Sequence, residues 1–451
     1  MERGTLSRRG FVQRSTAALA AAGLPLWMAN EMAQNQLRAA DDTKKPSDPI
    51  NVGLVGCGGQ GRGILGAALR NKGVQVVAVC DVDRARREKA VKELGGEGKV
   101  KGYESFRDLN DHKSLDAVLI GTPDHWHTLV AIDAMKKKKD VYCEKPLTLT
   151  VAEGQALTKV AQQTKRIFQV GSQQRSNARF RLACELVRNG RLGKIRRVET
   201  RIGSNPKGGP FKVEPVPDVL NWDMWLGQTP AVDYLKPRCH YSFRWWYEYS
   251  GGKMTDWGAH HNDIAQWALG MDESGPVSVS SKGTKPADDG MSYNCHPDFE
   301  VTYGYASGAQ VVCLSKGENG VLFEGEDGKS LFVSRGLIRA SDQAAKPKGG
   351  KGGKSGGPSK ILDEPLGKDA VRLYESSNHM ANWLNGIRTR KPCICTAEIG
   401  HRSVTVCHLG TISLRLGGKA LKWDPIKERF DDEAANKLLS REMRGEWKLP
   451  S

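Results

Sequence analysis

Residues 50–61 read Ile-Asn-Val-Gly-Leu-Val-Gly-Cys-Gly-Gly-Gln-Gly, a short apolar strand that runs into a glycine-rich turn. The turn fits Gly-x-Gly-x-x-Gly between a strand and a helix, which is typical of dinucleotide-binding folds. The first glycine permits the tight turn, the second lets the backbone approach a pyrophosphate, and the third allows close packing of helix on strand. N–H groups at the start of the helix bind phosphate. We expect cofactor contacts from Gly56, Gly58, Gly59, Gln60 and Gly61.

Asp81 ends the next strand-like run, residues 74–81. A carboxylate at this place accepts hydrogen bonds from a ribose diol. Together with the glycine turn, it predicts NAD as the cofactor. Arg84 lies nearby and leaves NADP as an alternative, because an arginine there accommodates a 2′-phosphate.

Strand-like and helix-like segments alternate over residues 49–172, which predicts βαβ units with a parallel sheet. After residue 172 this alternation ends, and an aromatic-rich stretch is followed by a series of strand-like segments. Residues 173–451 are therefore predicted to form a second, α+β domain with a large sheet. Within it, residues 344–360 are rich in Gly, Lys and Ser and predict a flexible loop, and one more helix is expected near residues 376–390.

The N-terminus is interpreted as an export signal. It reads Ser-Arg-Arg-Gly-Phe-Val over residues 7–12, followed by a weakly apolar stretch that is too short to span a bilayer. This pattern is typical of a twin-arginine (Tat) signal, which we place at residues 1–33 with a polar linker at 34–48. The protein is then expected in the periplasm or another extracytoplasmic compartment. The alternative is a basic tail with a chance apolar helix.

Composition narrows the remaining function classes. The chain has 451 residues, a formal net charge of +17 and ten cysteines. No run of 18 or more apolar residues occurs, so no integral membrane segment is expected after signal removal. Export argues against nucleic acid as the partner of the basic surface. The cysteines lack zinc-site spacing, which predicts buried thiols and no metal site.

Glu144-Lys145-Pro146 follows a strand-like run of the first domain. In open α/β sheets, ligands bind in the crevice outside the carboxyl ends of the strands. Lys145 is therefore predicted to point at the reactive end of the cofactor, the alternative being an ordinary surface lysine.

A further candidate site motif occupies residues 251–263, which read Gly-Gly-Lys-Met-Thr-Asp-Trp-Gly-Ala-His-His-Asn-Asp. Asp256, His260 and Asp263 have the spacing i, i+4, i+7, which puts them on one face if the segment is helical. A helix start disfavours imidazolium, and a neutral imidazole is what a general base needs. A capped structural helix is the alternative.

The order of these motifs resembles that of the Gfo/Idh/MocA oxidoreductases. The likeness also rests on Thr-Pro-Asp-His-Trp-His over residues 122–127 and on Ser-Asn-His-Met-Ala-Asn-Trp-Leu over residues 377–384. It implies a Rossmann domain, then a domain with a large, mostly antiparallel open sheet that often forms an oligomer interface. A homo-oligomer, dimer or tetramer, is implied, as is a helix near residue 380 that packs back on the first domain.

The resemblance also assigns roles to residues. Lys145 would position and polarise the reacting hydroxyl, and Asp256 and His260 match the family's Asp and His, with His260 as the proton acceptor. Further cofactor contacts are implied at Thr122, Pro123, His127, Glu144, Lys145 and Gln174. Candidate substrate contacts are Arg175, His240, Arg244, His261 and Asp263.

These features predict an NAD(P)-dependent oxidoreductase that acts on a hydroxyl of a sugar, polyol or related carbohydrate. Since free NAD is scarce outside the cytoplasm, an exported enzyme would carry and recycle a tightly bound cofactor. One alternative is a redox-neutral glycoside-cleaving enzyme that uses NAD transiently, with His240, Tyr241 and Glu248 as candidate acids and bases. Another is a non-catalytic sugar-binding protein, against which the intact Lys145, Asp256 and His260 set argues.

Overall fold

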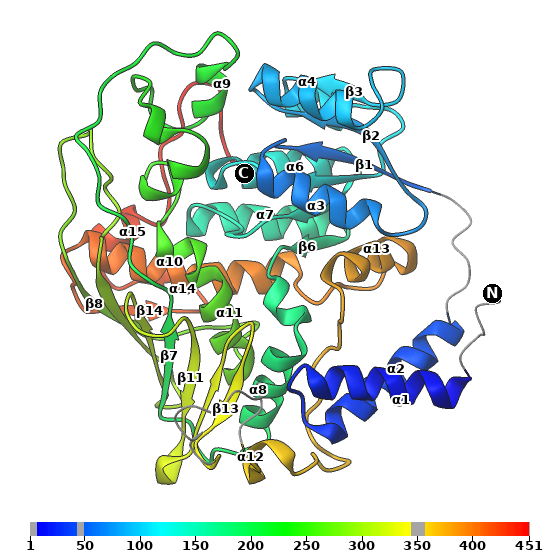
Figure 1. Ribbon diagram of the computed structural model, residues 1–451. Helices are drawn as coiled ribbons and strands as arrows, with labels where there is room; N and C mark the ends of the chain where they lie inside the picture. The colour runs from blue at the N-terminus through cyan, green and yellow to red at the C-terminus, as the bar shows by residue number, and fades with distance from the viewer. Residues whose placement is uncertain (1–6, 43–48, 344–356, 451) are drawn as a thin grey trace, which may run out of the picture.

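A six-stranded parallel sheet forms the first domain of the computed structural model, which describes residues 7–42, 49–343 and 357–450 (Figure 1). The strand order is β3-β2-β1-β4-β5-β6, and each neighbouring pair is parallel. This confirms the predicted Rossmann arrangement. The strands are β1 (Ile50–Val55), β2 (Val74–Cys80), β3 (Lys101–Tyr103), β4 (Ala117–Ile120), β5 (Asp140–Cys143) and β6 (Phe168–Val170).

Helices cover both faces of this sheet, because each face carries its own apolar core. One core joins the sheet to α3 (Gly59–Leu69) and α4 (Arg84–Glu93). The other joins it to α5 (Phe106–Asn110), α6 (His127–Lys136) and α7 (Val151–Thr164). The connections run from the carboxyl end of each strand, so the site residues that follow β1, β2, β4 and β5 meet at one edge.

The second domain contains a nine-stranded sheet of order β13-β12-β11-β7-β10-β9-β8-β14-β15. Every neighbouring pair is antiparallel except β7 and β10, which confirms a mostly antiparallel open sheet. The strands are β7 (Arg197–Arg201), β8 (Ser278–Gly283), β9 (Phe299–Gly304), β10 (Gln310–Leu314), β11 (Gly320–Glu324), β12 (Ser330–Val333), β13 (Ile338–Ala340), β14 (Leu421–Asp424) and β15 (Arg429–Phe430).

The helices of the second domain pack on that sheet and reach the first domain. A shared core holds α8 (Ala178–Arg188), α11 (Gly258–Leu269) and α14 (Ala397–Arg415) against the strands. The remaining helices include α9 (Trp222–Leu226), α10 (Lys253–Asp256), α12 (Lys360–Asp363) and α15 (Glu433–Lys437). Figure 1 shows α14 between the two sheets, and α14 also contacts α7 of the Rossmann domain.

The helix expected near residues 376–390 is α13 (His379–Thr389). Its Met380, Trp383 and Leu384 are buried in the same core as α3, so α13 completes one face of the Rossmann sheet. Asn378 caps the helix by accepting a hydrogen bond from the N–H of Ala381 at 3.0 Å.

Two helices, α1 (Arg8–Ala21) and α2 (Leu26–Asp42), lie beside the second domain (Figure 1). Met28 and Met32 of α2 are buried in the core of that domain, and Trp27 donates to the carbonyl of Leu362 at 3.0 Å. The linker expected over residues 34–48 is therefore helical as far as Asp42, and residues 43–48 lie outside the described part of the chain. Most of the loop expected at 344–360 also lies outside it.

None of the helices in the described residues combines the length and the apolar character needed to cross a membrane.

Candidate active site

A cavity of about 570 Å³ lies where the carboxyl edge of the parallel sheet meets the turn between α10 and α11. This volume is in the ordinary range of small-molecule sites. Its wall joins the glycine turn after β1, the loops after β4 and β5, and the aromatic segment around the 3₁₀ helix η4 (His240–Trp245). The motifs identified from the sequence thus meet around one cavity.

The glycine turn fits a dinucleotide phosphate. Gly56 has φ +93°, and a Cβ atom there would lie 2.7 Å from the backbone of Gly121. A Cβ at Gly61 would lie 1.8 Å from the carbonyl oxygen of Gly56, so Gly61 packs helix on turn without lining the cavity. Gly58 caps α3 with no side chain, which leaves the first N–H groups of the helix available to an anion.

Asp81 holds the turn in place from the end of β2. Its carboxylate accepts the N–H of Cys57 at 2.8 Å and the N–H of Asp83 at 2.9 Å. Burial raises the pKa of Asp81, while these two hydrogen bonds act in the opposite direction. Asp81 also lines the cavity, so its remaining lone pairs are placed to accept from a ribose diol. The residues present therefore fit NAD.

Lys145 and Asp256 form an ion pair across the cavity. Lys145 Nζ lies 2.6 Å from Asp256 Oδ1 and donates to the Asp256 carbonyl at 3.2 Å. Burial alone would raise the pKa of Asp256, but the opposing effects of Lys145, Arg244 and Lys253 prevail and hold it below its usual value. Asp256 is thus ionised at neutral pH and anchors the Lys145 ammonium.

His260 lies in the first turn of α11 and lines the same cavity. Burial lowers the pKa of His260 well below its usual value, and Lys145 and Arg335 lower it further. Among the described residues its Nδ1 atom has no hydrogen-bond partner, although the side chain is buried. His260 is therefore a neutral imidazole on the cavity wall, the protonation state that a general base needs.

His127 lines the cavity and also braces it. Its Nδ1 lies 2.7 Å from the carbonyl of Pro146 and its Nε2 lies 3.1 Å from the carbonyl of Thr122, so the one N–H of the neutral ring donates to the loop after β5 or to the loop after β4. Burial lowers its pKa to about 4, which keeps the ring neutral. Thr122, Pro123 and Glu144 line the cavity as expected.

Asp124 is a buried carboxyl group of the cavity wall that sequence reasoning did not single out. Its Oδ2 accepts a hydrogen bond from the Ser250 hydroxyl. Burial raises the pKa of Asp124 to about 7, against the opposing effects of Arg244, Ser250 and Lys145. The only sequence signal is its position in the run 122–127, since its environment comes from residues far along the chain.

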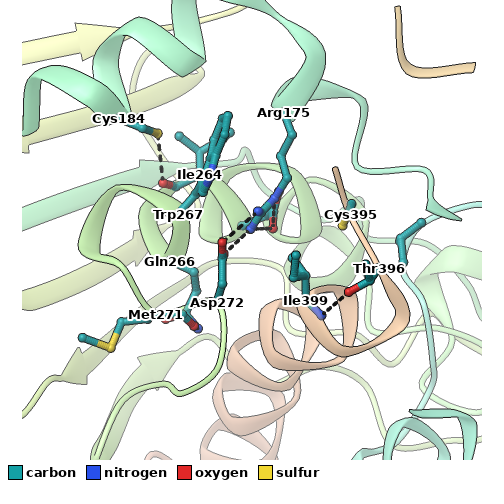
Figure 2. A network of polar contacts seen from close by, with 12 residues as sticks. Arg175, Cys184, Ile264, Gln266, Trp267, Met271, Asp272, Cys395, Thr396 and Ile399 are labelled. Carbon is teal, nitrogen blue, oxygen red and sulfur yellow. Dashed lines mark hydrogen bonds and ion pairs between the residues drawn. The ribbon is translucent and has the colours of Figure 1, made fainter. Parts of the chain in front are cut away.

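Besides Gly61, four predicted contacts are absent from the cavity wall: Gln174, Arg175, His261 and Asp263. Arg175 Nη2 pairs with Asp263 Oδ1 at 2.8 Å and with Asp272 Oδ1 at 2.7 Å, and Figure 2 shows Arg175 pointing toward Asp272. Arg175 Nε also donates to Asp263 and Nη1 to Asp272, so two carboxylates neutralise this guanidinium inside the fold. His261 lies between Gln174 and Asn319, at 3.3 and 3.0 Å.

The prediction that Asp256, His260 and Asp263 share one face is therefore wrong. The segment divides at Trp257 into α10 and α11, and α11 is buried on all sides. Its spacing consequently does not set a single functional face, and Asp263 turns toward Arg175 while His260 turns toward the cavity.

The aromatic segment contributes only part of its residues to the site. His240, Tyr241, Phe243 and Arg244 line the cavity, whereas Trp246 and Tyr249 are buried behind it in the aromatic core to which Phe243 also belongs. Glu248 is also outside the wall, where its carboxylate lies 2.8 Å from the side-chain amide of Asn294 and 3.4 Å from Arg238.

All ten cysteines are buried free thiols, as expected from their placement. Within the described ranges, no three His, Cys, Asp or Glu residues are grouped so as to hold a metal ion.

Two family models match this chain. The model described as an oxidoreductase family with an NAD-binding Rossmann fold matches residues 50–172. Its companion, described as the C-terminal alpha/beta domain, matches residues 208–338 and 359–449. Since the two matches cover most of the chain, the protein belongs to the GFO/IDH/MocA oxidoreductase family, whose Rossmann domain binds NAD.

Curated relatives match about a third of the chain. Glycosyl hydrolase family 109 protein 2 of Shewanella sp. (strain ANA-3) is 32% identical over 177 residues, 35% of this chain and 38% of the relative. Inositol 2-dehydrogenase of Salmonella typhimurium (strain LT2) is 32% identical over 146 residues, 32% of this chain and 43% of the relative. The chain thus spans less than half the length of these relatives.

Solved structures share the fold over nearly the whole of their chains. The aldose-aldose oxidoreductase of Caulobacter crescentus, complexed with glycerol, has a TM-score of 0.60 at 19% identity and covers 83% of this chain and 99% of its own. The WlbA dehydrogenase of Bordetella pertussis, in complex with NADH and UDP-GlcNAcA, has a TM-score of 0.62 at 18% identity, with 84% and 99% covered. At such identities the likeness shows the fold alone.

Proposed function

We propose that the protein is an NAD-dependent oxidoreductase that acts on a CH–OH group of a sugar, polyol or related carbohydrate. The observation that carries the proposal is the Lys145–Asp256 ion pair, at 2.6 Å, on the wall of the cavity that also presents the neutral ring of His260 and the glycine turn. A cation beside a neutral base is the arrangement that activates a hydroxyl group.

Each residue has a definite task in this proposal. NAD, when bound, takes up or supplies the hydride of the reacting carbon. Lys145 donates a hydrogen bond to the reacting oxygen, which favours its deprotonation, and Asp256 fixes the direction of the Lys145 ammonium. His260 accepts the hydroxyl proton in oxidation and returns it in reduction.

We further propose that the chain is exported by the twin-arginine route, assembles into a homo-oligomer, and carries its cofactor with it. The paired arginines at residues 8 and 9, the serine before them and Phe11 support the export proposal. If the enzyme is exported in its folded state with NAD bound, it would oxidise one sugar and reduce another with the same NAD molecule. It would then not need free NAD outside the cytoplasm.

The first experiment is purification without added cofactor, denaturation, and mass spectrometry of the released nucleotide. Bound NAD(H) supports a carried cofactor, whereas an empty protein overturns it and leaves a dehydrogenase that draws on free NAD. Hydride transfer is then tested by absorbance at 340 nm of the nucleotide-loaded protein, with one sugar or polyol added at a time so that no second sugar reverses the change. No absorbance change with any of them, in either direction, counts against the oxidoreductase.

Asp124 favours a second candidate, a redox-neutral enzyme that cleaves glycosides through transient oxidation. That route needs a further acid or base beside Lys145 and His260, and a buried carboxyl with pKa about 7 in the cavity wall suits the task. Release of nitrophenol from nitrophenyl glycosides with no net NADH would establish it. Net NADH formation from a free sugar would instead support the oxidoreductase.

A further inference from the structure

Two arginines of the cavity wall have no place in the chemistry proposed above. Arg244 comes from η4, and Arg335 comes from the loop between β12 and β13. Both line the cavity that His260 and Asp256 line. They therefore bring guanidinium groups from two separate segments of the second domain to the substrate's end of the site.

Arg335 is an available cation. Within the described residues no carboxylate lies within 4.0 Å of its guanidinium. The guanidinium lies over the Trp257 ring, 4.6 Å from its centroid, which orients the group without consuming its N–H donors. The side chain remains exposed on the cavity wall, so its donors are open to a ligand.

Arg244 is only partly neutralised. Its Nε lies 3.8 Å from Asp256 Oδ1, but that carboxylate already pairs with Lys145 at 2.6 Å and has Lys253 at 4.0 Å. The planes of Tyr241 and Phe243 hold the guanidinium, each with its centroid 4.8 Å away. The single negative charge of Asp256 is thus shared among Lys145, Arg244 and Lys253.

The surrounding charges leave an excess of positive charge. Lys145, Lys253, Arg244 and Arg335 act on Asp256, and the other carboxyl groups on which Lys145 and Arg244 act are Asp124 and Glu144, both with a pKa that burial raises. The phosphates of NAD do not account for the surplus, because they belong at the glycine turn. There the start of α3 and Arg86, whose Nη1 would lie 3.2 Å from a Cβ at Gly58, are placed to meet them.

We propose that the substrate is an acidic sugar whose carboxylate is bound by Arg335 and Arg244. The inference rests on the proposed function and names its substrate class. A planar guanidinium matches a carboxylate with two parallel hydrogen bonds, so the pair selects a uronate over the neutral sugar that lacks the charge. Arg335 is the specificity-determining member, since Arg244 also touches Asp256.

The test compares sugars that differ only at C6: glucuronate with glucose, and galacturonate with galactose, with glucose 6-phosphate as a further probe. The NADH-loaded protein is titrated with each sugar while tryptophan fluorescence is followed, and turnover is followed at 340 nm. The variants are Arg335→Gln, Arg335→Lys and the control Arg339→Gln. Arg339 lies on β13, pairs with Glu318 at 3.3 Å and does not line the cavity.

We expect a uronate to bind about 10- to 100-fold more tightly than its neutral partner. Arg335→Gln should abolish that preference, Arg335→Lys should restore part of it, and Arg339→Gln should leave it unchanged. Equal binding of both partners, or a preference that survives Arg335→Gln, would overturn the inference, as would stronger binding of the phosphate. Binding of a uronate through Arg335 without any hydride transfer would uphold the inference and refute the oxidoreductase. Turnover of neutral sugars alone would support the oxidoreductase and refute the acidic substrate.

Discussion

Lys145 Nζ lies 2.6 Å from Asp256 Oδ1, although 111 residues separate the two in the chain. Lys145 follows β5 of the first domain, and Asp256 ends α10 of the second. The reacting groups are therefore assembled only when the two domains dock, and neither domain alone contains the site.

Replacement of Lys145 should suppress turnover and spare nucleotide binding. We expect Lys145→Met to lower kcat by about 10²- to 10⁴-fold, the usual loss when a group that assists proton transfer is removed. Lys253→Met is the matched control, because Lys253 lies 4.0 Å from the same carboxylate but does not line the cavity. Steady-state kinetics with NADH-binding titrations checks this. A similar loss of kcat in both variants would contradict a specific role of Lys145 and would show that any positive charge near Asp256 suffices.

Gly61 and Gly63 offer a matched pair within α3. A Cβ at Gly61 would lie 1.8 Å from the Gly56 carbonyl oxygen, whereas one at Gly63 would meet nothing within 4 Å. Gly61→Ala should abolish NAD binding by displacing the turn. Gly63→Ala should retain binding and stabilise the helix by about 0.5–1 kcal/mol. Calorimetric titration with NAD and thermal unfolding distinguish them, and normal binding by Gly61→Ala would refute the close-packing role.

The Arg175 network should matter for stability. Arg175 and Asp263 are almost completely buried, so removing one leaves an unpaired charge at a cost of about 3–5 kcal/mol. Arg175→Met should lower the free energy of unfolding by that amount. The control Arg62→Met breaks an exposed pair with Glu93 and should cost about 0–1 kcal/mol. Urea unfolding provides both values, and an equally mild Arg175→Met would restore Arg175 as a candidate ligand contact.

Asp124 should make stability depend on pH. Burial raises its pKa from 3.8 to about 7. Because the folded-state pKa is the higher one, the folded protein holds this proton more tightly, and stability is lost as the pH rises through that window. The loss is about 1.4 kcal/mol per pH unit and stops above the folded pKa.

Asp124→Asn removes this loss. The free energy of unfolding of the variant, minus that of the wild type, should therefore rise from pH 5 to pH 7 and level off by pH 8. Other titrating groups occur in both proteins and cancel in the difference. A constant or falling difference would contradict a raised pKa for Asp124.

The Rossmann domain was predictable because its signals are local. The glycine turn, Asp81 and the strand–helix alternation each occupy a few consecutive residues, and the same applies to Lys145. In the second domain, strand-like patterns mark residues 195–202, 277–281, 299–305, 310–313 and 330–333, but none marks β11, β13, β14 or β15. These strands have only two to five residues, so the alternation of apolar and polar side chains is too brief to identify them.

The errors at the site have a similar cause. Asp124 gains its raised pKa from burial by remote segments, and Arg335 comes from a loop whose sequence carries no motif. Arg175 and Asp263 have the residue types of a ligand site but satisfy one another. Residue type and spacing indicate candidate site residues. Which of these residues face the cavity depends on their burial and on their hydrogen-bond and ion-pair partners in the fold.

The position of α13 bears on how the chain is synthesised. Trp383 belongs to the same core as β1 and α3, yet it emerges from the ribosome more than three hundred residues after them. The first domain leaves the tunnel with one face of its sheet covered only by α3 and α4, and it gains α13 only after nearly the entire second domain has been made. Completion of the nucleotide-binding half is thus a late event in biogenesis, reached together with the rest of the molecule.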